Sequence, residues 1–205
     1  MATKIVETFY PVDIANVAIK FEKETTAVTF GCTATLSAET EMRTIAAKCG
    51  AETIQEISKP IKMTATITGH APVSVLRRIF GLSNEGLTEG VYAYGLDSKG
   101  EGGTLTADIV DDFNDLVKIM AFPTMISVTG FKFTVDKGSD EVAPVELEFT
   151  CKPDEFRKFY YEAFADELED DELADKWRKN FSYELVKKGS ANPKHSRMTK
   201  EDVSK

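Results

Sequence analysis

Strict alternation of apolar and polar residues is the feature of this 205-residue chain that most restricts its fold. In several runs every second side chain is apolar, which places those side chains on one face of a half-buried strand. Threonine and β-branched residues dominate the runs, as suits a pleated surface. The runs are Val28 to Leu36, Ile61 to Ile67, Leu105 to Ile109, Phe131 to Val135 and Val145 to Cys151. With turn-forming clusters at 97–100 and 137–140, they predict a mainly β fold, a sandwich or barrel of antiparallel strands.

Two segments with helical spacing interrupt the strands. Pro72 stands where a first helical turn accepts proline, and Gly81 can take the left-handed position at the helix end. We therefore expect one short packed helix of about ten residues between them. Near the end of the chain, Leu173, Trp177 and Phe181 fall at i, i+4 and i+8 after an acidic start. This spacing predicts a C-terminal amphipathic helix.

Residues 38–59 form a separate polar segment. They read as two strands joined at Gly50, with too few large apolar side chains to be buried on either face. A helix over 39–48 is the competing interpretation. As a hairpin the segment would project from the core, and its edges would carry unpaired backbone groups. We expect such a long projecting hairpin to find a partner, which could be another copy of the same chain.

Length and charge limit the classes of function. The chain is long enough for a full core, and we expect residues 1–186 to form a single β domain. Residues 187–205 contain six basic and two acidic side chains and no aromatic anchor, which predicts a flexible basic arm. Because the whole chain carries −9, residues 1–186 carry −13. This balance argues against a protein that grips nucleic acid, and no apolar run or secretion signal predicts contact with a membrane.

Few residues suit catalysis, a cofactor or a metal, and we predict none of the three. There are two histidines, His70 between a strand and a helix and His195 in the basic arm, and no phosphate-binding or hydrolase motif occurs. The acids between 108 and 115 lack the spacing of a calcium loop. Three scattered cysteines predict reduced thiols, with Cys32 and Cys151 at buried apolar positions. The chain is therefore not expected to be an enzyme.

Aromatic residues gather before and within the C-terminal helix, beside an acidic stretch. Because single-strand binders place basic side chains among their stacking rings, we interpret these rings as packing in the core or between subunits. The candidate subunit-packing aromatics are Phe156, Phe159, Tyr160, Tyr161, Phe164 and Trp177.

The series of segments over roughly residues 60–165 resembles the major tail proteins, or tail tube proteins, of long-tailed, siphovirus-type bacteriophages of Gram-positive bacteria. Their order and spacing carry the resemblance, and none of them is a catalytic signature. The segments are 86–95, 105–113, 116–123, 131–136, 141–150 and 152–154. The charged helix around Trp177 and the basic arm lie outside the pattern.

The resemblance implies a structural subunit of the virion. Such proteins assemble in the host cytoplasm as hexameric rings that stack around a tape-measure protein, between a tail terminator and the distal tail or baseplate proteins. The genome passes through the lumen without specific binding, and an acidic lining would repel its phosphates. The residues that we expect at the lumen or the ring interface belong to the projecting segment: Glu39, Glu41, Arg43, Lys48, Glu52 and Glu56.

Three other interpretations stay open. The chain could be a related terminator, baseplate, connector or secretion-tube protein, which would form closed rings. It could be a small β-barrel binding module for host attachment, which would stay monomeric. It could be a carboxylate-dependent glycan hydrolase, which would need two acids at a fixed separation that the sequence does not identify.

Overall fold

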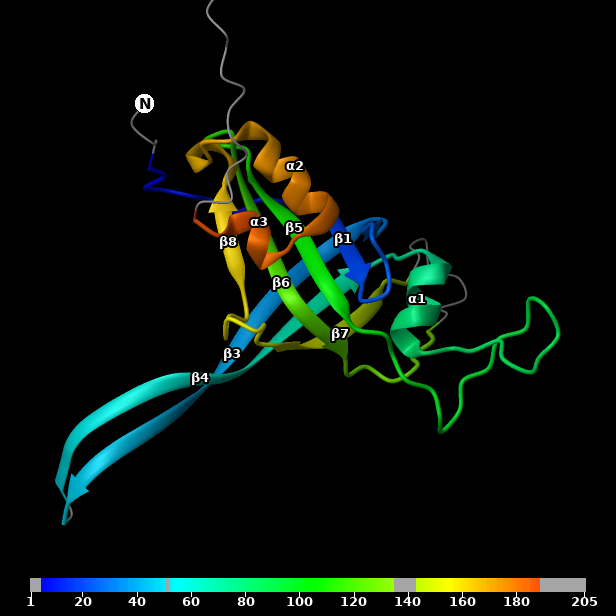
Figure 1. Cartoon of the computed structure of the whole chain (residues 1–205), viewed down its shortest axis with the longest axis horizontal. Coiled ribbons are helices and arrows are strands. Elements are labelled where there is room, and N and C mark those ends of the chain that lie inside the picture. The colour runs from blue at the N-terminus through cyan, green and yellow to red at the C-terminus, as the bar shows by residue number, and fades with distance from the viewer. Residues whose placement is uncertain (1–4, 51, 135–142, 189–205) are drawn as a thin grey trace, which may run out of the picture.

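The computed structural model describes residues 5–50, 52–134 and 143–188 (Figure 1). The strands are β1 (Asp13–Phe21), β2 (Val28–Thr29), β3 (Thr33–Cys49), β4 (Glu52–Gly69), β5 (Gly103–Asp111), β6 (Leu116–Ser127), β7 (Val145–Lys152) and β8 (Tyr161–Phe164). The helices are α1 (Val73–Phe80), the 3-10 turn η1 (Ala165–Glu167), α2 (Asp171–Asn180) and α3 (Tyr183–Val186). Every strand pair is antiparallel, which confirms the predicted fold class.

One eight-stranded sheet forms the body, in the order β2-β1-β5-β6-β7-β4-β3, with β8 paired to β6. Its two ends approach each other because β2 and β3 are joined by only three residues. Within this connection Phe30 N donates to Val17 O at 2.8 Å, and Gly31 N donates to His70 O at 2.9 Å. Strands β1, β4, β5, β6 and β7 all contribute to one buried cluster, so the sheet curves around its own core.

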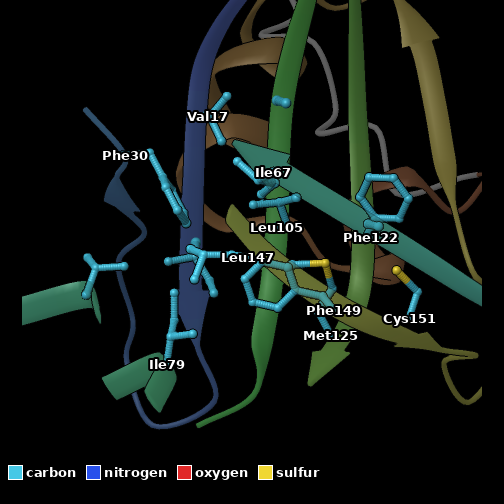
Figure 2. Packing of buried hydrophobic residues seen from close by; sticks show 14 of the residues in the cluster. Val17, Phe30, Ile67, Ile79, Leu105, Phe122, Met125, Leu147, Phe149 and Cys151 are labelled. Atoms are coloured by element: carbon cyan, nitrogen blue, oxygen red, sulfur yellow. The ribbon is translucent and has the colours of Figure 1, made fainter. Parts of the chain in front are cut away.

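The main core lies between the concave face of this sheet and α1 (Figure 2). The alternating residues of β5, β7 and the part of β4 from Met63 onward point into it as predicted, and Phe149 and Ile67 are fully buried there. The prediction is wrong for Ile61, which is the extra residue of a bulge and is 50% exposed. Cys151 is also buried, and burial raises the pKa of its thiol to about 12. This cysteine therefore packs as a small neutral hydrophobe.

Helix α1 closes one end of the core with Val75, Ile79 and Phe80. Pro72 is its N-cap residue, and Gly81 ends it with a φ of 71°. A Cβ atom on Gly81 would lie 2.4 Å from the backbone of Lys99, so both the conformation and the space require glycine. The predicted helix and its end are confirmed.

A second, smaller core lies on the opposite face of β6. Ile119 and Ala121 point outward from this strand and pack against Trp177, Phe181 and the rest of α2. The Trp177 indole N–H also donates to Met120 O at 3.2 Å. Asp170 caps the helix by accepting from Glu172 N at 3.0 Å. The predicted C-terminal amphipathic helix is therefore confirmed.

A buried ion pair joins α2 to the sheet. The Asp108 side chain of β5 is almost fully buried, and its Oδ2 accepts from Arg178 Nε at 2.8 Å and from Asn16 Nδ2 at 2.6 Å. Pairing of this kind offsets the cost of taking a carboxylate out of water. Asp108 thus has a structural role in holding the helix.

Two of the predicted strands are wrong in part. The run from Val28 to Leu36 is broken at residues 30–32, which cross between the ends of the sheet, and Cys32 is exposed instead of buried. Phe131 and Phe133 lie outside any strand, because β6 ends at Ser127; Phe131 instead contacts the ring of Phe80 at 5.6 Å. The predicted turn at 137–140 and residues 189–205 of the basic arm lie outside the described residues, and the division at 186 stays a prediction.

Candidate assembly surfaces

The longest element of the fold is the β3–β4 hairpin, which extends away from the body as a curved ribbon (Figure 1). Strand β7 covers the edge of β4 only from Met63 to Gly69. Residues 38–50 and 52–62 are exposed throughout, with the turn at Gly50, whose φ is 65°. The hairpin over 38–59 is therefore confirmed, and the helix over 39–48 is wrong. Over this length both edges carry backbone groups that no described strand pairs.

Two β-bulges shape this ribbon. The pairing shifts between Glu41 and Met42 and again between Ala47 and Lys48, and each shift leaves one extra residue on β4. The extra residues are Ile61 and Ile54. Pro60, beside the first bulge, cannot donate a backbone hydrogen bond. Bulges bend a strand and increase its twist, which accounts for the curvature in Figure 1.

The two faces of the hairpin differ in chemistry. We call the face that continues the buried side of β4, with Met42 and Thr44, the inner face, and the opposite one, with Glu39 and Glu41, the outer face. Directly paired residues share a face, as the 2.9 Å contact between Thr44 Oγ1 and Ser58 Oγ illustrates. The candidate lumen or ring-interface residues are therefore divided between the two faces of the hairpin. The outer face carries Glu39, Glu41, Arg43 and Glu52, and the inner face carries Lys48 and Glu56.

The hairpin also exposes the large apolar side chains that the sequence analysis judged too few to be buried on either face. Ile45 and Ile57 are paired on the outer face and are 51% and 49% exposed. The others are Met42, Ile54 and Ile61. Apolar side chains grouped on a projecting, unpaired ribbon are typical of an interaction surface.

The outer face continues onto the body as a surface rich in threonine and glutamate. Thr66 of β4 is paired with Glu148 of β7, and Thr68 with Glu146, so these acids lie on the same side of the sheet as Glu39. The sequence analysis missed Glu146 and Glu148. The signal was present, because they alternate with the buried residues of β7. The carboxylates of Glu39, Glu41, Glu146 and Glu148 thus share one face.

The candidate aromatics pack mainly within the chain. Trp177 is 3% exposed and lies in the second core, where Phe181 is its ring neighbour at 4.5 Å and also contacts Tyr161 at 5.1 Å. Tyr160 packs on Phe122. Phe164 contacts Phe9, Phe159 is half-buried, and Phe156 stacks on Tyr183 while remaining 41% exposed. Burial raises the pKa of Tyr160 and Tyr161, which keeps both phenols neutral. A role between subunits stays a prediction.

The β5–β6 turn is held by a buried carboxylate that the sequence analysis considered only as a possible calcium ligand. Asp111 is 0% exposed and accepts from Tyr10 N at 2.8 Å, Phe113 N at 2.9 Å and the Asn114 side chain at 2.8 Å. Burial favours the neutral acid, but these hydrogen bonds together lower the pKa of Asp111. The residue therefore fixes the turn as a carboxylate.

Replacement of Asp111 by Asn is expected to destabilise the protein most at neutral pH. The folded-state pKa of Asp111 is lowered, so its stabilising contribution is complete above the ordinary aspartate pKa of about 3.9 and is lost as the pH falls below it. Urea unfolding of both proteins at a series of pH values measures this. The difference should shrink on acidification; a difference that is constant with pH would contradict the assignment.

Two hollows among the described residues lie beside α1. A cavity of about 400 Å³ lies between α1 and the segments 131–134 and 143–146, and its lining includes Val73, Leu76 and Phe80. A wider one of about 720 Å³ lies beside the end of α1 and the exposed loop 82–99. Within the described ranges, no three His, Cys, Asp or Glu side chains converge as metal ligands. No helix in this part of the chain is long and apolar enough to span a membrane.

Comparisons with known proteins give distant structural likenesses. No protein-family model matches the chain, and no curated protein matches it. A chain in the cryo-EM structure of the anti-feeding prophage baseplate is similar with 14% identity and a TM-score of 0.41, over 80% of this chain and 97% of that one. A chain of the anti-feeding prophage tube-terminating cap has 12% identity and a TM-score of 0.43, over the same shares.

Proposed function

We propose that this protein is a structural subunit of a bacteriophage tail tube. Copies of the chain form hexameric rings, and the rings stack around a tape-measure protein into the channel for genome ejection. In this proposal the protein belongs to the virion, is assembled in the host cytoplasm, contacts terminator and distal tail or baseplate proteins, and is not an enzyme. The resemblance of residues 60–165 to major tail proteins supports it.

The observation that carries the proposal is the unpartnered β3–β4 hairpin. In the described part of the chain, no strand other than β3 pairs with β4 between Glu52 and Lys62, and the paired Ile45 and Ile57 are half exposed there. Natural proteins seldom leave a long apolar edge open, because it pairs with other chains. A second copy can pair with these edges, and repetition of that contact around an axis makes a closed ring.

The part of the outer face nearest the body, with Glu39, Glu41, Glu146 and Glu148, supports passage of DNA without binding. Affinity for duplex DNA comes largely from lysine and arginine that displace counterions from the phosphates. A lumen lined by the threonines and glutamates of β3, β4 and β7 would instead repel the duplex. We infer that the part of the outer face nearest the body, around Glu39 and Glu148, lines the lumen.

Sedimentation velocity of the purified full-length chain over a range of concentrations tests the proposal. A tube subunit polymerises through non-closing contacts, so fast-sedimenting polymers should appear above a critical concentration and grow with total protein. The test should be repeated with preformed seeds, because assembly could require an initiator. Monomer alone under all of these conditions would contradict the proposal.

Charge reversal on the outer face should make the tubes bind DNA. Tubes of the Glu39→Lys and Glu148→Lys double variant are expected to pellet with duplex DNA at low salt and to release it as salt is raised, because new cations would displace phosphate counterions. Glu56→Lys, on the inner face, is the matched control and should leave the DNA in the supernatant. Equal binding by both variants, or by neither, would contradict the placement of the lumen.

A closed-ring connector of the tail is the second candidate function. The same hairpin edges and acidic face suit a single ring as well as a stack of rings. Sedimentation velocity distinguishes a connector from a tube subunit. A connector would sediment as one species of fixed size at every concentration, whereas tubes would grow with total protein.

A further inference from the structure

The β5–β6 turn is held by hydrogen bonds to one buried carboxylate. The Asp111 carboxylate accepts from the backbone N–H groups of Phe113 and Asn114 and from the Asn114 side chain. Tyr10 N, from the N-terminal segment, donates to the same carboxylate. Asp115 completes the turn with a φ of 54°, in the left-handed region that aspartate tolerates better than most residues. A buried group thus defines the shape of a loop in which Asp112, Phe113 and Asp115 are exposed.

Three exposed residues of this turn, Asp112, Phe113 and Asp115, form a surface that we call the knob. Phe113 is 78% exposed and makes a T-shaped contact with Tyr10, at 6.2 Å between ring centroids. Asp112 and Asp115 flank it, are exposed, and form no ion pair with any described residue. An exposed phenylalanine held in a fixed position by a buried carboxylate suits an interface better than a free surface.

The outer face of the β3–β4 hairpin carries the complementary chemistry. Arg43 lies directly opposite Lys59, and such like-charged cross-strand pairs destabilise an isolated sheet. Neither cation forms an ion pair with a described residue. Toward the body, the next cross-strand pair on the outer face is Glu41 with Lys62. Toward the tip, the next cross-strand pair on the outer face is Ile45 with Ile57, and both side chains are half exposed. Two unpaired cations therefore border an apolar patch.

These two surfaces cannot meet within one chain. The β5–β6 turn lies at the top of Figure 1, near the start of α2, and the hairpin tip lies at the bottom left, at the other end of the molecule. A contact between them in different copies is heterologous, since each copy uses one surface for the copy before it and the other for the copy after it. Where its rotation does not close a ring, such a contact extends an assembly along an axis.

We propose that the knob formed by Asp112, Phe113 and Asp115 docks on the outer face of the hairpin of a second copy in the neighbouring ring. Phe113 packs on Ile45 and Ile57, and the two aspartates face Arg43 and Lys59. This inference rests on the proposed function and specifies the axial contact between rings. The opposite charges would fix the register of stacking, as complementary potentials do at other interfaces.

Charge exchange tests the contact. One variant carries Arg43→Glu and Lys59→Glu, and the other carries Asp112→Lys and Asp115→Asn, since asparagine keeps the left-handed conformation. Alone, each should raise the critical concentration for assembly at least about tenfold, because like charges then face each other. An equimolar mixture should associate again, because each acidic hairpin meets a basic knob. Lys48→Glu, on the inner face, should stay within about twofold of the wild type.

The outcomes separate this inference from the proposed function. Thermal unfolding first establishes that each variant is folded. If the wild type forms tubes and both charge variants form them equally well, the axial contact is wrong and the tube proposal stands. If the wild type forms no tubes but the mixed variants associate, the contact stands and the tube proposal fails. A folded mixture that associates no better than its components overturns the contact in either case.

Discussion

Removal of the hairpin tip should abolish assembly and leave the monomer folded. The variant replaces residues 42–61 by Asn-Gly, so that Glu41 and Lys62, which are already paired, flank a two-residue turn. The removed residues are exposed wherever the structure describes them, so the core loses no packing. We expect the free energy of unfolding to change by no more than about 0.5 kcal/mol, as for other surface changes.

The effect on assembly is expected to be large, because the proposed role gives the hairpin several contacts at once. Its edges would supply backbone hydrogen bonds to another copy, and its exposed isoleucines would supply apolar area. Pelleting assays over concentration measure the loss. A graded variant, Ile45→Thr with Ile57→Thr, keeps the length and the β propensity of the hairpin and should weaken assembly without abolishing it. Normal polymer from the shortened chain would contradict the role assigned to the hairpin.

Trp177→Ala should be among the most destabilising substitutions in the C-terminal region. The indole is buried between α2 and the outward face of β6, beside Ile119 and Ala121, and its N–H donates to Met120 O. Deletion of a buried aromatic side chain of this size costs about 3–5 kcal/mol, through lost burial and the cavity that remains. Urea unfolding should show a lower midpoint with an unchanged slope.

Two control variants accompany Trp177→Ala. One separates the loss of packing from the loss of the indole hydrogen bond, and the other measures the effect of a substitution at an exposed position. Trp177→Phe keeps most of the apolar contact and loses the donor to Met120, so it should cost clearly less than alanine. Leu96→Ala alters a fully exposed residue and should change the free energy of unfolding by no more than about 0.5 kcal/mol. A cost below about 1 kcal/mol for Trp177→Ala would show that the second core contributes little to folding.

The strands that the sequence predicts well are those whose alternation is uninterrupted. β4 and β7 alternate in burial where they pack on the core, and α1 and α2 carry clear end signals at Gly81 and Asp170. In β5 the apolar Leu105 and Ala107 alternate with polar residues, although Thr106 and Asp108 on the other face are buried as well. β1 was missed for a physical reason. Its register shifts between Ala15 and Ala18, and Asn16 adopts a φ of 50°, so its buried residues do not alternate.

The candidate surfaces were predictable where they depend on local sequence. The polar segment around Gly50 indicated the hairpin, but the spacing of Ile54, Ile57 and Ile61 is helical, and only the two bulges make it compatible with a strand. The role of Asp111 could not be found locally, because one of its donors, Tyr10, lies 101 residues away in the chain. Tertiary contacts of this kind leave no periodic signal.

Negative-stain electron microscopy of the purified chain at high concentration tests the central claim most directly. The account predicts hollow tubes with a regular axial repeat and sixfold symmetry in end-on views. Particles that remain single chains at every concentration and salt tested, including after addition of tail-tip seeds, would contradict it.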